Sequence, residues 1–379
     1  MPTHIACNED EIVEAVMTAR AWKSPLEIMG AGTKQSLGRS VVTMGSVLDV
    51  SGLRGILSYE PNELILTAAP GTPVAEIAAV LAEKGQRLGF DPPDWGPLLG
   101  AEPGLGTIGG AISADANGPA RVRCGAVRDQ LLGFRGVNGF GEAFKAGGKV
   151  VKNVTGFDLP KLVCGAMGTL CVLTEVTLRV FPRPPLSMVI SVRDVAPEEG
   201  FALLRKVWSS PLDATGLAYS HGRALIRLEG EKAPLSEKCS MLATMLGGRI
   251  AEEVPEGEIA FRAIGSGEVF ADTPFDVWRA FVPPASAAAV AAEIDAPLWL
   301  GDWAGGLLWL GTLPGSDGVR AAVNRAGGHA TLLRAGEETR ERLEIFEPQS
   351  AVRMAVTKSV KAAFDPLGLF NPGRMWDGV

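Results

Sequence analysis

The spacing of apolar residues at the start of the chain predicts a helix followed by a short strand. Apolar residues within 12–17 lie on one helix face, and Asn8 or Asp10 is a suitable cap for that helix. Residues 26–29 then form a short apolar strand that leads directly into the loop GAGTKQSLG at 30–38. The backbone amides of such a loop can surround a phosphate, although the same sequence also suits a plain tight turn.

Three further strands are predicted within 41–69, from the segments VVTMGSVLDVS, GILSYE and ELILTAAPG. The turn at 70–73 then opens a helix predicted over 74–84. Thr72 is its expected N-cap, and Glu76 lies in its first turn, where a negative charge is favourable.

The stretch 103–180 combines closely spaced glycines with Thr, Ser and Asn, and ends in a β-rich apolar segment at 170–181. Its glycines at 104–110 are too dense for a stable helix or strand interior, whereas 131–147 predicts a hairpin. Backbone without Cβ atoms offers N–H groups to an anion or to a flat polar ring. Together with the loop 30–38, this stretch predicts a dinucleotide site, and FAD is the dinucleotide that we expect.

The proline-rich segment 182–185 is the clearest linker, and we place a domain boundary there. After it, strands and helices alternate in short units, which is typical of an α+β domain with one antiparallel sheet and helices on one face. The apolar residues of the turn-rich tail favour docking on the first domain. The tryptophans of this half are predicted to be core residues: Trp208, Trp278, Trp299, Trp303 and Trp309. The predicted domains are 1–182, a cap over 186–360 and a tail over 361–379.

The composition narrows the classes of function. The 379 residues carry a formal net charge of −7, so the basic footprint that nucleic-acid binding requires is lacking. The five cysteines form no CxxC pair, which fits reduced thiols in the cytoplasm and no iron–sulfur cluster in this chain. The N-terminus is acidic where a signal peptide needs a basic flank, and the uncharged stretch 303–316 is too short and broken to cross a bilayer. We therefore expect a cytoplasmic protein that could associate with a membrane through a membrane-bound partner.

Two blocks of the central stretch resemble the FAD-binding domain of the vanillyl-alcohol oxidase family (the PCMH type). They are GTIGGAISADANGPARVRCGAVRDQLLGFRGV and KVVKNVTGFDLPKLVCGAMGTLCVLTEVTLRV, and FDPLGLFNPGRM is similar to the C-terminal signature of that family. RALIRLEG and GGLLWLG extend the resemblance to the FAD-binding E subunits of bacterial glycolate oxidases, also called glycolate dehydrogenases. The resemblance implies an α+β fold, with two α/β subdomains enclosing FAD, a small α+β cap and a tail that returns to the FAD domain.

The resemblance also implies which positions bind the cofactor. The first loop would offer amides to the pyrophosphate, 70–71 would form a second wall, and 107–113 would line the pyrophosphate and ribityl chain. Residues 175–176 would lie near the adenosine, and 371–374 near the flavin. The full set is Gly30, Ala31, Gly32, Thr33, Pro70, Gly71, Thr107, Ile108, Gly109, Gly110, Ser113, Gly118, Gly125, Asp129, Glu175, Val176, Asn371 and Arg374.

Departures from the family pattern are equally informative. Covalent members place a histidine in the first loop, where this chain has none, so we expect non-covalent FAD, with Cys124 a weaker candidate for a thioether link. The family's TGYDL is TGFDL here, so Phe157 lacks the phenol donor. The HxGDGNxH motif of related hydroxy-acid dehydrogenases, which serves metal and substrate, is absent. We therefore expect no metal site, and we leave the catalytic residues unassigned.

These features favour a FAD-binding subunit of a complex that oxidises glycolate to glyoxylate. Such a subunit would relay electrons or support a catalytic flavoprotein subunit and an iron–sulfur subunit, while a small 2-hydroxy acid is the substrate of the complex. One alternative is a self-sufficient FAD-dependent 2-hydroxy acid dehydrogenase, in which Arg223, Arg227 or another cap arginine clamps the carboxylate. Another alternative is a flavin-free structural partner.

Overall fold

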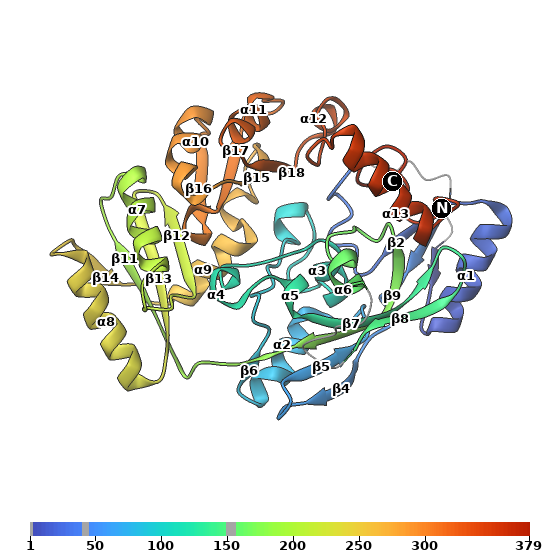
Figure 1. Cartoon of the computed structure of the whole chain (residues 1–379), viewed down its shortest axis with the longest axis horizontal. Coiled ribbons are helices and arrows are strands. Elements are labelled where there is room, and N and C mark those ends of the chain that lie inside the picture. The colour runs from blue at the N-terminus through green and yellow to red at the C-terminus, as the bar shows by residue number, and fades with distance from the viewer. Residues whose placement is uncertain (1–2, 40–44, 149–156) are drawn as a thin grey trace. The chain divides into compact units, whose positions relative to one another are not determined.

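The structure, a computed structural model, describes residues 3–39, 45–148 and 157–379. The chain forms two compact units, whose elements are labelled in Figure 1. Within the described residues, no helix is both long and apolar enough to cross a membrane. Unit 1 comprises 1–116, 126–182 and 348–379, and unit 2 comprises 117–125 and 183–347.

The described residues of unit 1 form three sheets, and the two larger ones have separate cores. A five-stranded antiparallel sheet has the order β4-β5-β9-β7-β8, and its core includes apolar residues of the helices α2, α3, α5 and α6. A three-stranded parallel sheet, β1-β3-β2, packs with helix α1 around a second core, and β6 pairs with β10. The elements are β1 (Thr3–Ile5), α1 (Glu9–Trp22), β2 (Leu26–Met29), β3 (Ser46–Asp49), β4 (Ile56–Glu60), β5 (Ile65–Ala68), α2 (Val74–Glu83), β6 (Gln86–Arg87), α3 (Ile108–Ser113), α5 (Val127–Gln130), β7 (Leu131–Asn138), β8 (Ala143–Gly147), α6 (Leu159–Val163), β9 (Cys171–Arg179), β10 (Phe181–Pro182) and α13 (Ala351–Phe364).

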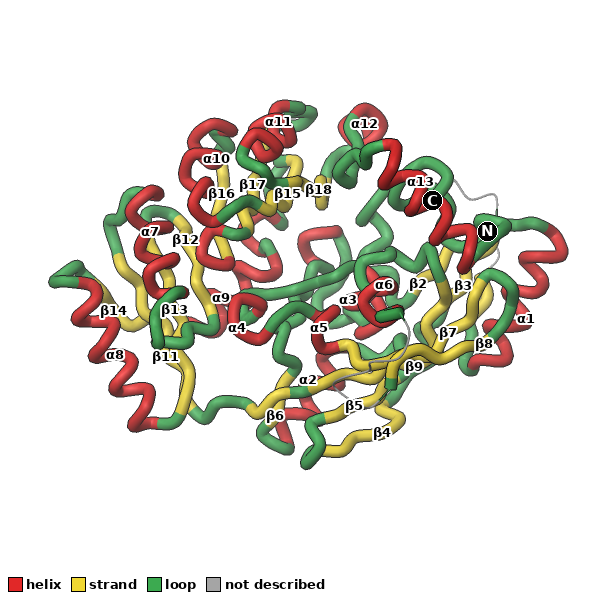
Figure 2. Tube along the Cα trace, viewed as in Figure 1, coloured by secondary structure: helices red, strands yellow, loops and turns green. Residues whose placement is uncertain are grey.

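Local sequence explains where the first elements begin and end. Of the two predicted caps, Asn8 and not Asp10 precedes helix α1, and its side chain accepts a hydrogen bond from the amide of Glu11. The predicted Thr72 cap is wrong: the residue before α2 is Pro73, and the Thr72 hydroxyl donates to the carbonyl of Ala69 instead. Between β6 and α5 the chain is mostly loop (Figure 2).

The C-terminal tail is built into the small parallel sheet of unit 1. The amide of Leu26 donates to the carbonyl of Leu369, and the amide of Asn371 donates to the carbonyl of Leu26. Leu369 and Phe370 are buried in the same core as α1, so the tail's apolar residues are part of the subdomain's interior.

A buried lysine fastens the end of α13 to this tail. Lys361 donates to the carboxylate of Asp365 at 2.8 Å, and to the carbonyls of Thr169 and Phe370 at 2.6 and 2.8 Å. The carboxylate of Asp365 accepts in turn from the amides of Leu369 and Phe370. Every polar group of this cluster therefore has a partner, which is the condition for burying an ion pair without a large penalty.

Unit 2 is built on an eight-stranded antiparallel sheet of order β14-β11-β13-β12-β16-β17-β15-β18. Apolar residues of α7, α8, α10 and α11 form one core with alternate residues of the strands, so these helices cover one face. Helix α9 packs on the opposite face, where its Phe261 lies against Gly216 and its Gly257 against Val189, so the expectation of helices on one face only is incomplete. The elements are α4 (Arg121–Cys124), β11 (Leu186–Val192), α7 (Pro197–Trp208), β12 (Gly216–Ser220), β13 (Arg223–Gly230), α8 (Lys232–Leu246), β14 (Ala251–Glu253), α9 (Gly257–Ser266), β15 (Asp276–Phe281), α10 (Ala287–Ile294), β16 (Leu298–Asp302), β17 (Leu307–Thr312), α11 (Gly318–Arg325), β18 (His329–Arg334) and α12 (Glu337–Arg342).

Close contacts explain the position of α9 and of segment 117–125. A Cβ at Gly216 would lie 2.6 Å from the ring of Phe261, so glycine permits α9 to approach the sheet. The indole of Trp303 donates to the carbonyl of Gly118 at 3.1 Å, which ties 117–125 to the hairpin after β16. These long-range contacts place a segment predicted for the first domain in unit 2.

The tryptophans of unit 2 differ in burial. Trp278 and Trp309 are fully buried and Trp303 is buried, in agreement with the core prediction, and Trp299 is partly buried against the main core. Trp208 is 54% exposed, so its core assignment is wrong. It is the last residue of α7, where a side chain can project past the end of the helix.

Candidate cofactor site

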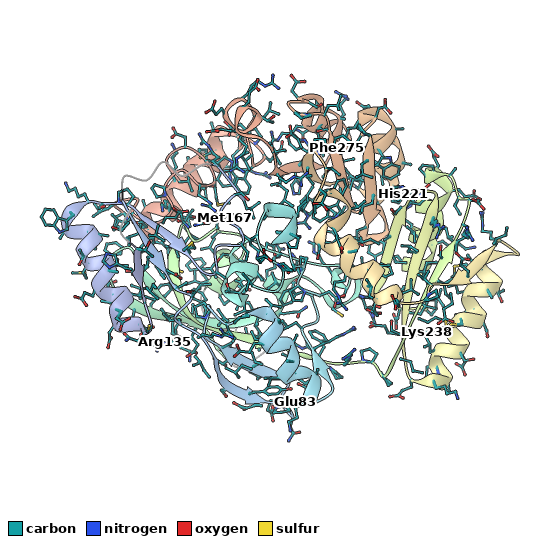
Figure 3. The ribbon with its side chains drawn as sticks, turned by 180° about the vertical axis from the view of Figure 1, so that it is seen from behind. Glu83, Arg135, Met167, His221, Lys238 and Phe275 are labelled. Atoms are coloured by element: carbon teal, nitrogen blue, oxygen red, sulfur yellow. The ribbon has the colours of Figure 1, made fainter. Side chains whose placement is uncertain are left out.

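One cavity of unit 1 gathers residues from segments that are far apart in sequence. It lies where β2 ends, and the loop after β2, the start of α3, the turn before β9 and the C-terminal tail all contribute to it. Met167, labelled in Figure 3, belongs to the turn before β9. The lining residues are Glu27, Ile28, Met29, Gly30, Ala31, Gly32, Thr33, Lys34, Gln35, Val50, Pro70, Thr107, Gly109, Gly110, Ser113, Ala114, Met167, Gly168, Cys171, Leu173, Asn371 and Arg374.

The loop that follows β2 presents unused backbone donors to this cavity. Gly32 has φ +73°, a left-handed conformation that turns successive amides toward one side. In the described part of the chain, no acceptor receives a hydrogen bond from the amides of 31–34. The loop is closed by other groups, since the amide of Gln35 donates to the carbonyl of Gly32. Four consecutive amides are thus available for an anion.

Two glycines allow the walls of the cavity to approach each other. A Cβ at Gly30 would lie 2.9 Å from the hydroxyl of Thr107, and a Cβ at Gly109 would lie 2.7 Å from the Cβ of Pro70. Real Cβ atoms do not approach this closely, so larger residues would force the first loop and α3 apart.

Gly109 and Gly110 lie in a short helix, α3, so the expectation that these glycines are too dense for a helix is wrong for them, whereas Gly104 and Gly106 precede the helix. Thr107 caps α3 by accepting a hydrogen bond from the amide of Gly110 at 3.2 Å. The amide of Ile108 donates to the carbonyl of Thr72, and that of Gly109 to the carbonyl of Pro70, at 2.9 and 2.8 Å. Tertiary packing against the turn before α2 therefore overrides the poor helix propensity of glycine. The first amides of α3 are engaged within the protein.

Two tail residues hold the cavity's loops in place. The amide nitrogen of Asn371 donates to the carbonyl of Met167, and its oxygen accepts from the amide of Ile28, both at 2.8 Å. The guanidinium of Arg374 donates to the carbonyls of Lys34 and Gln35 at 3.0 and 2.8 Å. Both residues were proposed from the sequence as flavin neighbours, and both also position the loops that line the cavity.

Several residues expected at the cofactor site lie outside the cavity lining. Gly71 follows the lining residue Pro70, and its amide donates to the carbonyl of Leu53 and not to the cavity. Ile108 and Val176 are fully buried in the core, and Asp129 accepts a hydrogen bond from the amide of Ala126 at the start of α5. The expected set outside the lining is Gly71, Ile108, Gly118, Gly125, Asp129, Glu175 and Val176, of which Gly118 and Gly125 belong to unit 2.

The structure also assigns lining residues that sequence reasoning did not select. Lys34 follows Thr33, the last residue of the first loop that was expected at the cofactor, and a basic residue beside an expected anion site was a usable signal. Met167 and Cys171 come from the turn before β9 and from its first residue, and nothing in their local sequence marks them. Burial raises the pKa of the Cys171 thiol to about 12, so it is a neutral apolar wall rather than a nucleophile.

The described residues supply no base of the histidine type to this cavity. His4, His221 and His329 are exposed and do not line it; Figure 3 labels His221, which lies at the turn between β12 and β13. Within the described ranges, no cluster of His, Cys, Asp and Glu is arranged to hold a metal ion. Phe157 is 93% exposed, and the neighbouring Asn153 and Thr155, which the sequence suggested for a polar ring edge, lie outside the described residues.

The cap arginines proposed for a substrate carboxylate have other contacts. Arg227 is buried, and its guanidinium donates to the carbonyl of Thr215 at 2.9 Å and to Glu258 at 3.2 Å. It also lies over the ring of Phe261, so it fastens α9 to the sheet. The side chain of Arg223 is 47% exposed and lies 3.9 Å from Glu252.

The donors of this cavity fit the phosphates of a dinucleotide. Two phosphate groups require hydrogen-bond donors, positive charge and room for a close approach of the backbone. The cavity supplies the amides of 31–34, which have no described acceptor, the ammonium of Lys34, and glycines in its walls. Apolar lining from Ile28, Val50 and Leu173 gives the same cavity a surface suited to an uncharged part of the ligand.

Comparison with known proteins gives the same cofactor. Residues 4–147 match a family model described as a FAD binding domain. The chain is 34% identical to the glycolate oxidase subunit GlcE of Escherichia coli over 372 residues, which is 96% of each chain. It is 30% identical to the glycolate oxidase subunit GlcD of Bacillus subtilis over 177 residues, 47% of this chain and 36% of that one. With the D-2-hydroxyglutarate dehydrogenase of Stutzerimonas stutzeri it shares 24% identity, over 97% of this chain and 89% of that enzyme.

Solved structures confirm the fold class. The 4-ethylphenol oxidase of Gulosibacter chungangensis superposes with a TM-score of 0.72 at 14% identity, over 99% of this chain and 89% of that one. An alkyldihydroxyacetonephosphate synthase superposes with a TM-score of 0.72 at 15% identity, over 98% of this chain and 76% of that one. The fold and the cavity thus define a flavoprotein with a PCMH-type FAD-binding domain, as predicted. The chain belongs to the family of the glycolate oxidase subunit GlcE, a family of FAD-dependent oxidoreductases.

Proposed function

We propose that this chain is the FAD-binding subunit of a glycolate oxidase, a complex that oxidises glycolate to glyoxylate. The observation that carries the proposal is the match to GlcE over 96% of both chains, together with a cavity whose free amides suit the cofactor's phosphates. When bound, FAD supplies an acceptor for two electrons. The chain's own residues bind the cofactor, exclude water from it and fix its position.

We further propose that the subunit relays electrons or supports catalysis rather than oxidising the substrate itself. Removing a proton from a hydroxy acid requires a positioned base, and histidine is the usual one. The ionisable residues that line the cavity are Glu27, Lys34, Cys171 and Arg374. Glu27 lies 3.6 Å from Arg374, and the thiol of Cys171 is neutral, so neither is a poised base.

The proposed partners are a catalytic flavoprotein subunit and an iron–sulfur subunit, which would bring the complex to the inner surface of the cytoplasmic membrane. Support comes from the curated relatives that are named as subunits, GlcE and GlcD. The proposed cofactor residues are those that line the cavity, with the first loop at the pyrophosphate and the tail near the flavin.

Co-purification of the native complex tests this function. The complex is isolated through a tag on this chain, its subunits are identified, and the flavin is counted per subunit and released by acid. We expect one non-covalent FAD on this chain and a second flavoprotein in the complex. A flavin-free chain within an active complex would instead support the structural-partner alternative.

A self-sufficient 2-hydroxy acid dehydrogenase is the second candidate. The similarity to D-2-hydroxyglutarate dehydrogenase over 97% of this chain favours it. Turnover of a hydroxy acid by the isolated chain with an artificial electron acceptor would establish this alternative.

A further inference from the structure

Lys34 places an ammonium group between the two glycine loops of the cavity. Its Nζ lies 3.6 Å from the position that a Cβ on Gly106 would take, and 3.9 Å from the corresponding position on Gly110. Its one hydrogen-bond partner among the described residues is the hydroxyl of the adjacent Thr33, at 3.5 Å. The charge is thus held inside the cavity rather than extended into solvent.

The described residues provide no close counter-charge for the ammonium of Lys34. Within the described ranges, no carboxylate approaches the Nζ of Lys34 to 4.0 Å. The charge of Asp94 acts on Lys34 from a longer distance, and its two carboxylate oxygens already accept hydrogen bonds from the amides of Gly96 and Gly104, at 3.0 and 2.6 Å. Burial lowers the pKa of Lys34, and Asp94 only partly opposes that shift. A half-buried cation without a paired anion is costly unless a ligand supplies the anion.

The backbone around Lys34 points to the same kind of ligand. The preceding amides from Ala31 onward donate to no described acceptor, whereas the first amides of α3 donate to Pro70, Thr72 and Thr107. The guanidinium of Arg374 donates to the carbonyls of Lys34 and Gln35 and so holds the loop in place. The loop's amides and the ammonium of Lys34 therefore face the same cavity.

We propose that Lys34 binds the pyrophosphate of FAD as its principal cationic partner, and that the amides of the first loop complete this anion site. The inference rests on the FAD-binding function of the chain and adds a residue to it. Lys34 selects FAD over flavins that lack phosphate, and the α3 amides serve packing rather than anion binding.

Equilibrium binding to the flavin-free full-length chain tests this proposal. The probes are FAD and riboflavin, which lacks phosphate, and binding is followed by the change in flavin fluorescence. The variants are Lys34→Met, Lys34→Arg and Lys84→Met, the last removing an exposed lysine of unit 1 as a control for net charge. Each measurement is repeated over a range of salt concentrations, and the urea unfolding midpoint of each flavin-free variant is recorded.

We expect Lys34→Met to raise the Kd for FAD about ten- to hundredfold, in the range for a charge-assisted hydrogen bond. The dependence of log Kd on log salt concentration should become shallower, Lys34→Arg should recover most of the affinity, and Lys84→Met should match wild type. Riboflavin binding should not change. The flavin-free Lys34→Met variant should be at least as stable as wild type, because an unpaired buried charge has been removed.

Three results would overturn the proposal. They are an unchanged Kd for FAD in Lys34→Met, equal weakening of FAD and riboflavin, and a flavin-free Lys34→Met variant that is clearly less stable than wild type. The last two would mean that Lys34 supports the loop rather than binding phosphate. Failure of wild type to bind FAD would reject the FAD-binding function itself, and the role of Lys34 with it.

Discussion

Replacing Lys361 by Met tests whether the C-terminal tail is fastened by a buried ion pair. The ammonium of Lys361 donates three hydrogen bonds, to Asp365 and to the carbonyls of Thr169 and Phe370. Methionine has similar length and no charge, so it leaves the Asp365 carboxylate buried without its cation and two carbonyls without a donor. Removing one partner of a buried pair typically costs about 3–5 kcal/mol, and we expect a loss of that size in the free energy of unfolding of unit 1.

The assay is urea unfolding of the full-length chain, with a matched surface control. Lys358→Met removes an exposed lysine one turn earlier on α13, and we expect a change within about 0.5 kcal/mol. The double variant Lys361→Met/Asp365→Asn should lose less than the sum of the two single losses, because a neutral amide is no longer an unpaired charge. A loss below about 1 kcal/mol in Lys361→Met would show that the buried ion pair does not fasten the tail.

The same variant should also weaken FAD binding, although Lys361 does not line the cavity. The tail carries Asn371 and Arg374, whose hydrogen bonds position the loops around the cavity. Loosening the tail should therefore lower the flavin content of the purified protein. Full flavin content in a destabilised Lys361→Met variant would show that the loops keep their positions without the tail.

Three further predictions concern the cavity and its surroundings. Gly109→Ala should cost about 1–3 kcal/mol of stability and reduce flavin content, because its Cβ would meet Pro70. Gly148→Ala should be neutral, because its Cβ would meet no atom of the described residues within 4 Å; urea unfolding and flavin absorbance measure both variants. FAD affinity should fall as pH rises through the pKa of Lys34, which burial lowers below 10.5, because the phosphate binds the charged ammonium. In Lys34→Arg this pH dependence should disappear, and fluorescence titration at several pH values measures it. Cys7 is exposed and should react rapidly with a thiol reagent, whereas Cys171, whose pKa burial raises to about 12, should react only on unfolding; peptide mapping after timed labelling distinguishes them.

Much of the fold of unit 1 could be predicted because its signals are local. The strand 26–29, the loop after it and the cap at Asn8 depend on neighbouring residues, and each lies where the spacing indicated. Helix α3 could not be predicted in this way. Glycine disfavours a helix locally, and α3 is stabilised by hydrogen bonds to Pro70 and Thr72, which are distant in sequence.

The part of the candidate site that could be predicted from the sequence is its glycines, because glycine allows the backbone to approach a ligand closely. The expected Gly30, Gly32, Gly109 and Gly110 all line the cavity. The same attention to glycine passed over Lys34. Its basic side chain beside the loop could be read from the sequence, but its lack of an ion-paired carboxylate among the described residues is a property of the folded chain. Segment 117–125 illustrates a second limit, because its assignment to unit 2 depends on the distant Trp303. Arg227 shows a third limit of the sequence. It was proposed to bind a substrate carboxylate, but in the folded chain it donates to Thr215 and Glu258.

Anaerobic reduction of the bound flavin by glycolate tests whether this chain oxidises the substrate itself. The isolated chain, reconstituted with FAD, is mixed with excess glycolate, and the visible flavin band is followed, with chemical reduction by dithionite as the positive control. If this chain binds FAD but lacks the base for substrate oxidation, dithionite should bleach the band and glycolate should not, until the partner subunits are added. Bleaching by glycolate in the isolated chain, at the rate at which the complex turns over, would contradict the account.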